Sequence, residues 1–164
     1  MLVAFQDEPW SNRVRWVPAE NLHVTLRFLG DVSPERTDAL LDRVRAVATE
    51  TDPFRCTLDE LGAFPKPTRA RVLIARISPA AALVDLAARV EAAVVAAGLA
   101  PETRRFRPHV TLGRVRRPPL RGVTLAASLA PIRVAADEVV LFQSDLGAGG
   151  AHYTPLARLP IGPA

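Results

Sequence analysis

Cysteine is almost absent from this sequence. Cys56 is the only cysteine among 164 residues, which excludes an internal disulfide and any metal cluster that needs several cysteines. It lies in a segment with strand character, where we expect a buried thiol. The first ten residues also lack the basic start and the long apolar run of a secretory signal. Together these features predict a protein of the reducing cytoplasm.

Long hydrophobic runs are missing as well. No apolar stretch approaches the roughly 18 residues that a membrane span needs, and the alanine-rich stretch near 80–97 is interrupted by Asp85, Arg89 and Glu91. We therefore expect no membrane segment. Hydrophobic residues still make up 49% of the chain and charged residues 23%, which is typical of a folded protein. The length fits one domain over residues 1–164.

Aromatic residues and lysine are scarce. An aromatic content of 5% disfavours a dedicated platform for stacking single-stranded bases. Lys66 is the only lysine, so arginine supplies nearly all of the positive charge and the net charge of +4. Seven arginines and no acidic residue fall within residues 104–121, namely Arg104, Arg105, Arg107, Arg114, Arg116, Arg117 and Arg121. Guanidinium groups suit phosphate, so this segment favours an anionic ligand over a merely solvated surface.

Hydrophobic periodicity predicts alternating strands and helices. Two helices are expected, one over 34–50 with Ser33 as N-cap and one that starts at Ser78–Pro79 and ends at Gly98. The strands expected from period-two patterns and β-branched residues are 13–18, 23–29, 54–61, 71–77, 109–116, 132–143 and 153–159.

One tetrapeptide occurs twice in this order of elements. Of three histidines, His23 and His109 are both followed by Val-Thr-Leu. The succession of motif strand, helix, two strands, helix and motif strand suggests a duplication. We therefore predict an α+β fold of two pseudo-symmetric lobes around a central cleft, each lobe an antiparallel sheet with helices on its outer face.

Strand alternation gives each motif a chemical face. His23 and Thr25 point to one side of a strand and Val24 to the other, and the second motif repeats this with His109 and Thr111. Two imidazoles can serve as acid and base near neutral pH, while threonine hydroxyls donate to the oxygens of a tetrahedral anion. Two structural histidines and a zinc site are the alternatives, and no further ligand at zinc spacing supports the latter. We expect no metal or other cofactor.

The repeated His-x-Thr-x pattern resembles that of the 2H phosphoesterase superfamily. The flanking segments 15–30, 106–114 and 153–158 are similar to the RNA 2′,3′-cyclic phosphodiesterase family, whose members are also known as 2′-5′ RNA ligases. The resemblance extends from about residue 13 to 161.

The resemblance implies a reaction and roles. It implies metal-independent hydrolysis of RNA 2′,3′-cyclic phosphate ends to 2′-phosphomonoesters, together with 2′-5′ ligation. His109 would be the proton acceptor, His23 the proton donor, and an RNA with a cyclic phosphate terminus the partner. The two motifs are too alike for the residues themselves to assign acid and base. We expect a monomer.

Three arginines are candidates for holding the phosphate. The resemblance points to Arg114, five residues after His109, although strict alternation would turn Gly113 and not Arg114 to the site. A bulge or strand end at Gly113 would reconcile the two. Arg27 and Arg107 have the correct parity with their histidines.

Other interpretations stay open. His152-Tyr153-Thr154-Pro155 also fits the pattern, but Pro155 removes a ladder donor and we interpret the match as chance. The substrate could instead be a cyclic phosphate on a small nucleotide or a 2′-5′ oligonucleotide. A different class of function, a non-catalytic RNA-binding module, would use the same basic segment.

Overall fold

The computed structural model describes residues 9–116, 119–120, 131–147 and 150–163. The chain has an α+β fold and divides into two compact units. Unit 1 consists of Met1–Thr25, Cys56–Ala80 and Pro108–Val134, and unit 2 of Leu26–Arg55, Ala81–Arg107 and Ala135–Ala164. Arg117 and Arg121 of the basic segment lie outside the described residues.

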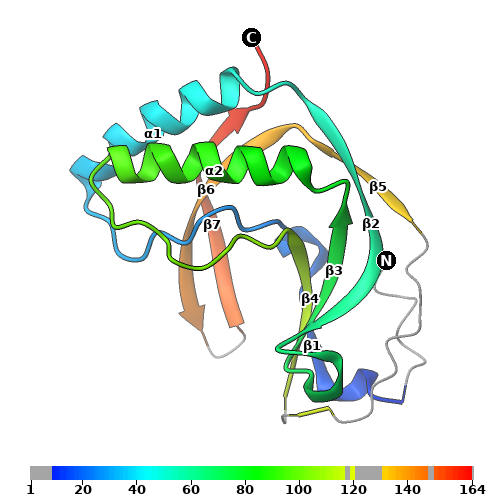
Figure 1. Ribbon diagram of the computed structural model, residues 1–164. Helices are drawn as coiled ribbons and strands as arrows, with labels where there is room; N and C mark the ends of the chain where they lie inside the picture. Colours follow the sequence, from blue (N-terminus) through cyan, green and yellow to red (C-terminus); the bar gives the residue numbers. More distant parts are fainter. Residues whose placement is uncertain (1–8, 117–118, 121–130, 148–149, 164) are drawn as a thin grey trace. The chain divides into compact units, whose positions relative to one another are not determined.

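Unit 1 is built on a five-stranded sheet (Figure 1). Its strand order is β1 (Val14–Trp16), β4 (His109–Val115), β3 (Val72–Ser78), β2 (Phe54–Phe64) and β5 (Ile132–Ala136). β4 pairs antiparallel with both β1 and β3, and β3 pairs antiparallel with β2. β3 lies at the centre of the sheet, where Leu73, Ile74 and Ala75 are all fully buried. This explains why its sequence is almost continuously apolar and not alternating.

Unit 2 packs two helices with a β-hairpin. The helices α1 (Pro34–Thr49) and α2 (Ala81–Ala96) lie side by side (Figure 1), and β6 (Glu138–Gly147) pairs antiparallel with β7 (Gly150–Pro160). Their shared core buries apolar side chains from all four elements, including Leu40, Val44, Leu86, Val90, Val94, Val139 and Leu159. The apolar stripe of each helix therefore stabilises this unit by removing hydrocarbon from water.

Both predicted helices are confirmed. Ser33 is the N-cap of α1 and Pro34 its first residue, where a missing backbone N–H costs nothing. Past the end of α2, Gly98 has a φ of +86°, a conformation that glycine adopts without strain. The predicted strands at 13–18, 54–61, 71–77, 109–116 and 153–159 correspond to β1, β2, β3, β4 and β7.

Three expectations need correction. The predicted strand 23–29 is reduced to one isolated bridge at Val24, because the chain leaves the sheet for unit 2 after Thr25. The predicted strand 132–143 is divided at Asp137 into β5 and β6, because its two halves pair within different sheets. Both helices belong to unit 2, and the described part of unit 1 has only short 3₁₀ turns, so the helices are not shared between two lobes as expected.

Candidate active site

The two motifs are direct neighbours in unit 1. Val24 and Val110 form an antiparallel bridge, and both side chains point away from the face that carries the histidines. Continuing this register by one residue on each side places His23 opposite Thr111 and Thr25 opposite His109. The two histidines are then diagonal neighbours, for which a separation of about 7–8 Å is usual. In this register each imidazole faces the hydroxyl-bearing residue of the other motif.

His23 is oriented by a backbone carbonyl. The 3₁₀ turn Ala19–Asn21 precedes the first motif, and the Nδ1 atom of His23 lies 2.8 Å from the carbonyl oxygen of Asn21. Because a carbonyl oxygen only accepts hydrogen bonds, Nδ1 carries a hydrogen and donates it. In the neutral ring Nε2 is therefore the nitrogen without a hydrogen, and it is the ring atom that can exchange a proton.

His109 is oriented by an aromatic ring. It is the first residue of β4, and its imidazole meets the ring of Phe64 in a T-shaped contact with 5.1 Å between centroids and 78° between planes. Phe64 ends β2, two strands away from β4 in the sheet. The contact restricts the rotation of the imidazole about its side-chain bonds.

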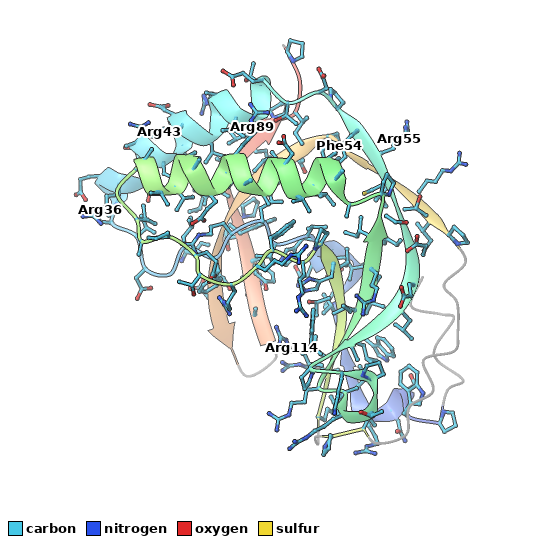
Figure 2. The ribbon with its side chains drawn as sticks, in the orientation of Figure 1. Arg36, Arg43, Phe54, Arg55, Arg89 and Arg114 are labelled. Carbon is cyan, nitrogen blue, oxygen red and sulfur yellow. The ribbon has the colours of Figure 1, made fainter. Side chains whose placement is uncertain are left out.

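A bulge in β4 brings Arg114 onto the face of the histidines. Opposite β3, Ile74 pairs with Thr111 but the preceding Leu73 pairs with Gly113, so β4 has one extra residue at Leu112. Since β3 alternates regularly, its residues 72, 74 and 76 share one face, and their partners Arg114, Thr111 and His109 share it too. The irregularity anticipated near Gly113 is confirmed. Figure 2 marks Arg114 on β4.

Arg27 has internal partners. Its guanidinium lies in unit 2, where Nε is 2.6 Å from Glu91 Oε2 and the two terminal nitrogens donate to the carbonyl oxygens of Phe28 and Ala100 at 2.7 and 2.6 Å. Only 13% of its side chain is exposed. The parity argument for Arg27 assumed a strand that is absent. A substrate contact by Arg27 stays a prediction, as does one by Arg107, which is exposed in the irregular segment before β4.

Two residues beside the motifs escaped the sequence analysis. Arg76 pairs in register with His109, and its Nε lies 3.2 Å from Glu60 Oε1. It is the only charged residue within the apolar strand β3, and this pattern could have marked it as a candidate site residue. No such signal exists for Phe64, because its contact with His109 depends on how three strands lie together.

Other candidate features lie elsewhere. His152 is exposed on β7 in unit 2 and pairs in register with Asp145. Among the described residues, no three side chains of His, Cys, Asp or Glu are grouped closely enough to hold a metal ion, and no helix could span a membrane. Cys56 is buried as expected, and burial raises the pKa of its thiol.

An open groove of about 400 Å³ lies in unit 2. Its walls are mainly alanine and valine from α1 and α2, with Arg43, Glu50 and Arg89 also contributing. It contains no histidine, cysteine or hydroxyl side chain. We therefore place the candidate chemistry at the paired motifs in unit 1.

The model of the 2′-5′ RNA ligase superfamily matches residues 4–148. The chain belongs to this superfamily. It is 34% identical to the RNA 2′,3′-cyclic phosphodiesterase of Escherichia coli (strain K12) over 149 residues, which are 88% of this chain and 78% of the relative. It is 37% identical to the enzyme of that name from Geobacillus stearothermophilus over 99 residues, 60% of this chain but only 32% of the relative. The resemblance inferred from the two motifs is confirmed.

Solved structures share the fold of this superfamily member. A crystal structure of a Thermus thermophilus protein aligns with a TM-score of 0.80 and 26% identity, over 99% of this chain and 90% of the other. The Escherichia coli LigT protein in complex with 3′-AMP aligns with a TM-score of 0.70 and 31% identity, over 91% and 82%. The matched part of the chain spans 58% of a further relative, from Aeropyrum pernix.

Proposed function

We propose that this chain hydrolyses 2′,3′-cyclic phosphates at RNA ends to 2′-phosphomonoesters, with His23 and His109 as the acid–base pair. The observation that carries the proposal is the bridge between Val24 and Val110, which sets the two His-Val-Thr-Leu motifs against each other in antiparallel register. The names of the relatives support the coarser part of the proposal, a phosphodiesterase that acts on RNA 2′,3′-cyclic phosphates.

The proposed reaction is one displacement at phosphorus. His109 accepts a proton from water as the water oxygen attacks phosphorus, the bond from phosphorus to the 3′ oxygen breaks, and His23 donates a proton from Nε2 to that oxygen. The product carries a 2′-phosphate and a 3′-hydroxyl. The two histidines end with exchanged protons and return to their starting states through solvent.

Other residues of the site would stabilise the transition state. Thr25 and Thr111 lie opposite the histidines and would donate to the non-bridging oxygens, where negative charge increases. The guanidinium of Arg114 would offset that charge from the same sheet face. The carbonyl oxygen of Asn21, 2.8 Å from His23 Nδ1, would hold the ring in place while Nε2 gives up its proton.

The three histidines allow a matched test. Separate His23→Ala and His109→Ala substitutions are expected to lower kcat by about 10²–10⁴-fold on an RNA that ends in a 2′,3′-cyclic phosphate. His152→Ala removes an exposed histidine of unit 2 and should leave kcat unchanged. Turnover retained in both of the first two variants would exclude the mechanism.

The product identifies acid and base. If His23 is the donor, the phosphate must remain on the 2′ oxygen. Nuclease digestion or chromatography of the product measures which oxygen carries the phosphate. A 3′-phosphate would mean that the other bond breaks, and the roles of the histidines would be exchanged. We propose that no metal takes part, so dialysis against a chelator should leave kcat unchanged.

The same site supports ligation. With the 5′-hydroxyl of a second RNA in place of water, the displacement joins the two ends through a 2′-5′ bond and again leaves a 3′-hydroxyl. We propose this as a second activity, in keeping with the name of the superfamily. Its test is the formation of a longer product when an RNA with a 5′-hydroxyl is supplied in excess.

A small nucleotide is the alternative substrate. The Escherichia coli relative was solved in complex with a small nucleotide, 3′-AMP, which supports this alternative. A non-catalytic RNA-binding module would instead bind the cyclic end without product, so the turnover assay separates it from the enzyme. We also propose that the chain acts as a monomer in the cytoplasm, and light scattering of the purified protein tests the monomer.

A further inference from the structure

Four arginines lie together where β1 and β4 pair. Arg15 on β1 is the register partner of Arg114 on β4. One pair further along, the N–H of Arg116 donates to the carbonyl oxygen of Arg13 at 2.8 Å, so these two residues also face each other. Arg13, Arg15, Arg114 and Arg116 are all exposed, and we refer to them as the arginine face.

The arginine face lies on the site's side of the sheet. Residues two apart in a strand point to the same side, so both arginine pairs share one face. On the other face, Val14 is buried against Gly113. Because the bulge at Leu112 sets Arg114 on the face of Thr111 and His109, the arginine face continues directly from the candidate active site across to β1.

The direct opposition of Arg15 and Arg114 is unfavourable without a ligand. Like charges directly opposite each other in a sheet destabilise it. None of the ion pairs formed among the described residues involves Arg15, Arg114 or Arg116, whereas Arg89, Arg104 and Arg158 each pair with a glutamate. A ligand that carries several negative charges would remove this repulsion.

We propose that the arginine face binds the backbone phosphates of the RNA strand that leads to the cyclic end. The inference rests on the proposed function and makes RNA ends, not cyclic mononucleotides, the preferred substrate. Alternate residues of a strand are about 6.7 Å apart, so two rows of guanidinium groups can contact successive phosphates of an extended strand. Contacts to phosphate do not depend on base sequence, so binding should tolerate any RNA sequence.

A double substitution, Arg15→Gln with Arg116→Gln, tests the proposal and leaves Arg114 in place. The measurement is the ratio of kcat/KM for an RNA decamer that ends in a 2′,3′-cyclic phosphate to that for adenosine 2′,3′-cyclic phosphate. We expect the wild type to prefer the decamer. In the double variant the ratio of the two kcat/KM values should be at least tenfold lower. The matched control, Arg36→Gln with Arg43→Gln, removes the same charge from the exposed surface of α1 (Figure 2) and should leave the ratio unchanged.

A binding measurement separates this inference from the proposed function. Binding of a decamer that ends in a 2′-phosphate, followed by fluorescence anisotropy over a range of salt, needs no turnover. Loss of two phosphate contacts should make the slope of log affinity against log salt shallower by about 1.4. The double variant removes the repulsion between Arg15 and Arg114, so its Tm should not fall below that of the wild type. An unchanged or higher Tm would show that the variant is folded.

The outcomes are distinct. An unchanged ratio and salt slope, or an equal loss in the α1 control, would overturn the arginine face and leave the proposed function standing. If the wild type hydrolyses neither substrate, the proposed function fails, and the salt slope alone decides whether the arginine face binds RNA.

Discussion

Gly113 determines how closely β1 and β4 can pair at the edge of the candidate site. A side-chain carbon at this position would lie 2.5 Å from Val14 Cγ1, 3.1 Å from the carbonyl oxygen of Arg15 and 3.2 Å from Trp16 Cε3. The glycine thus lets β1 approach β4 closely, directly after the bulge and before Arg114. A substitution here disturbs both the pairing of β1 and the position of Arg114.

Gly113→Ala is expected to lower the free energy of unfolding by about 1–3 kcal/mol, because β1 must move to admit the methyl group. Urea unfolding followed by circular dichroism measures the change. Val14→Ala removes the nearest obstacle, so the double variant should lose less stability than the sum of the single variants. Additive losses would show that the two residues do not compete for this space.

Phe64 is expected to act as a positioning residue for His109. Phe64→Leu removes the T-shaped contact and should lower kcat by about two- to tenfold with little change in KM, because an aromatic pair contributes about 0.5–1.5 kcal/mol. Phe64→Tyr keeps the ring and should restore kcat. Phe54→Leu, at the other end of β2, is the control for lost packing and should leave kcat unchanged. A fall in kcat for Phe54→Leu as large as that for Phe64→Leu would assign the effect to stability.

At the scale of elements, the segment after the first motif is held by an ion-pair cluster and not by a strand. Arg27 binds Glu91 of α2 and the carbonyl oxygen of Ala100, while Glu91 also accepts from the backbone N–H of Glu102 at 2.7 Å. One guanidinium therefore ties three parts of unit 2 together. This explains how the chain at Arg27 and Phe28 is held without ladder hydrogen bonds.

Arg27→Gln is expected to lower the free energy of unfolding by about 1–3 kcal/mol, because it leaves a partly buried carboxylate and two carbonyl oxygens without their donor. Thermal and urea unfolding measure this. Glu91→Gln should lower the free energy of unfolding less in the Arg27→Gln variant than in the wild type. If Arg27→Gln instead raises KM strongly while stability is unchanged, the original prediction of a substrate contact is correct.

Glu102 makes part of this cluster sensitive to acid. The side-chain hydrogen bonds from Arg104 lower the pKa of its carboxyl to about 2. A lowered pKa means that the ionised group favours the folded state above the usual carboxyl range, and that this contribution is lost as pH falls toward 2. The difference in Tm between wild type and Glu102→Gln should therefore be largest near neutral pH and shrink in acid. Glu20→Gln, at an exposed position in unit 1, is the control, and an equal pH response in both variants would contradict the assignment.

At the scale of the whole molecule, the chain passes repeatedly between the two units. Each unit is assembled from three separate segments, and β2 and β5 each have residues in both units. Neither unit corresponds to a continuous piece of sequence. This interleaving supports the expectation of one domain over 1–164.

Thermal unfolding should accordingly occur in a single transition, with equal calorimetric and van't Hoff enthalpies. Differential scanning calorimetry tests this, and the destabilising Gly113→Ala variant of unit 1 should shift the whole transition to lower temperature. Two transitions, of which only one moves, would show that the units unfold independently.

The local sequence was sufficient for some features and not for others. Helix caps, apolar stripes and the two His-Val-Thr-Leu motifs are local patterns, so α1, α2, most strands and the pair of histidines could be predicted. The strand at 23–29 could not be excluded, because its alternation is real while its backbone partners are decided by the exit of the chain into unit 2. The same alternation is the basis for predicting a substrate contact by Arg27, which stays a prediction.

Only the tertiary structure determined the register in which the strands of the sheet pair. Whether Arg114 shares the face of His109 depends on one extra residue at Leu112, and that bulge is visible only against the regular alternation of β3. The bridge between Val24 and Val110, the ring of Phe64 on His109 and the opposition of Arg15 to Arg114 all join residues far apart in the chain. The sequence by itself thus determined which groups are the candidates for the proposed chemistry, because they recur in a local motif. The fold decided which groups surround them, because contacts across strands depend on pairing that no local pattern encodes.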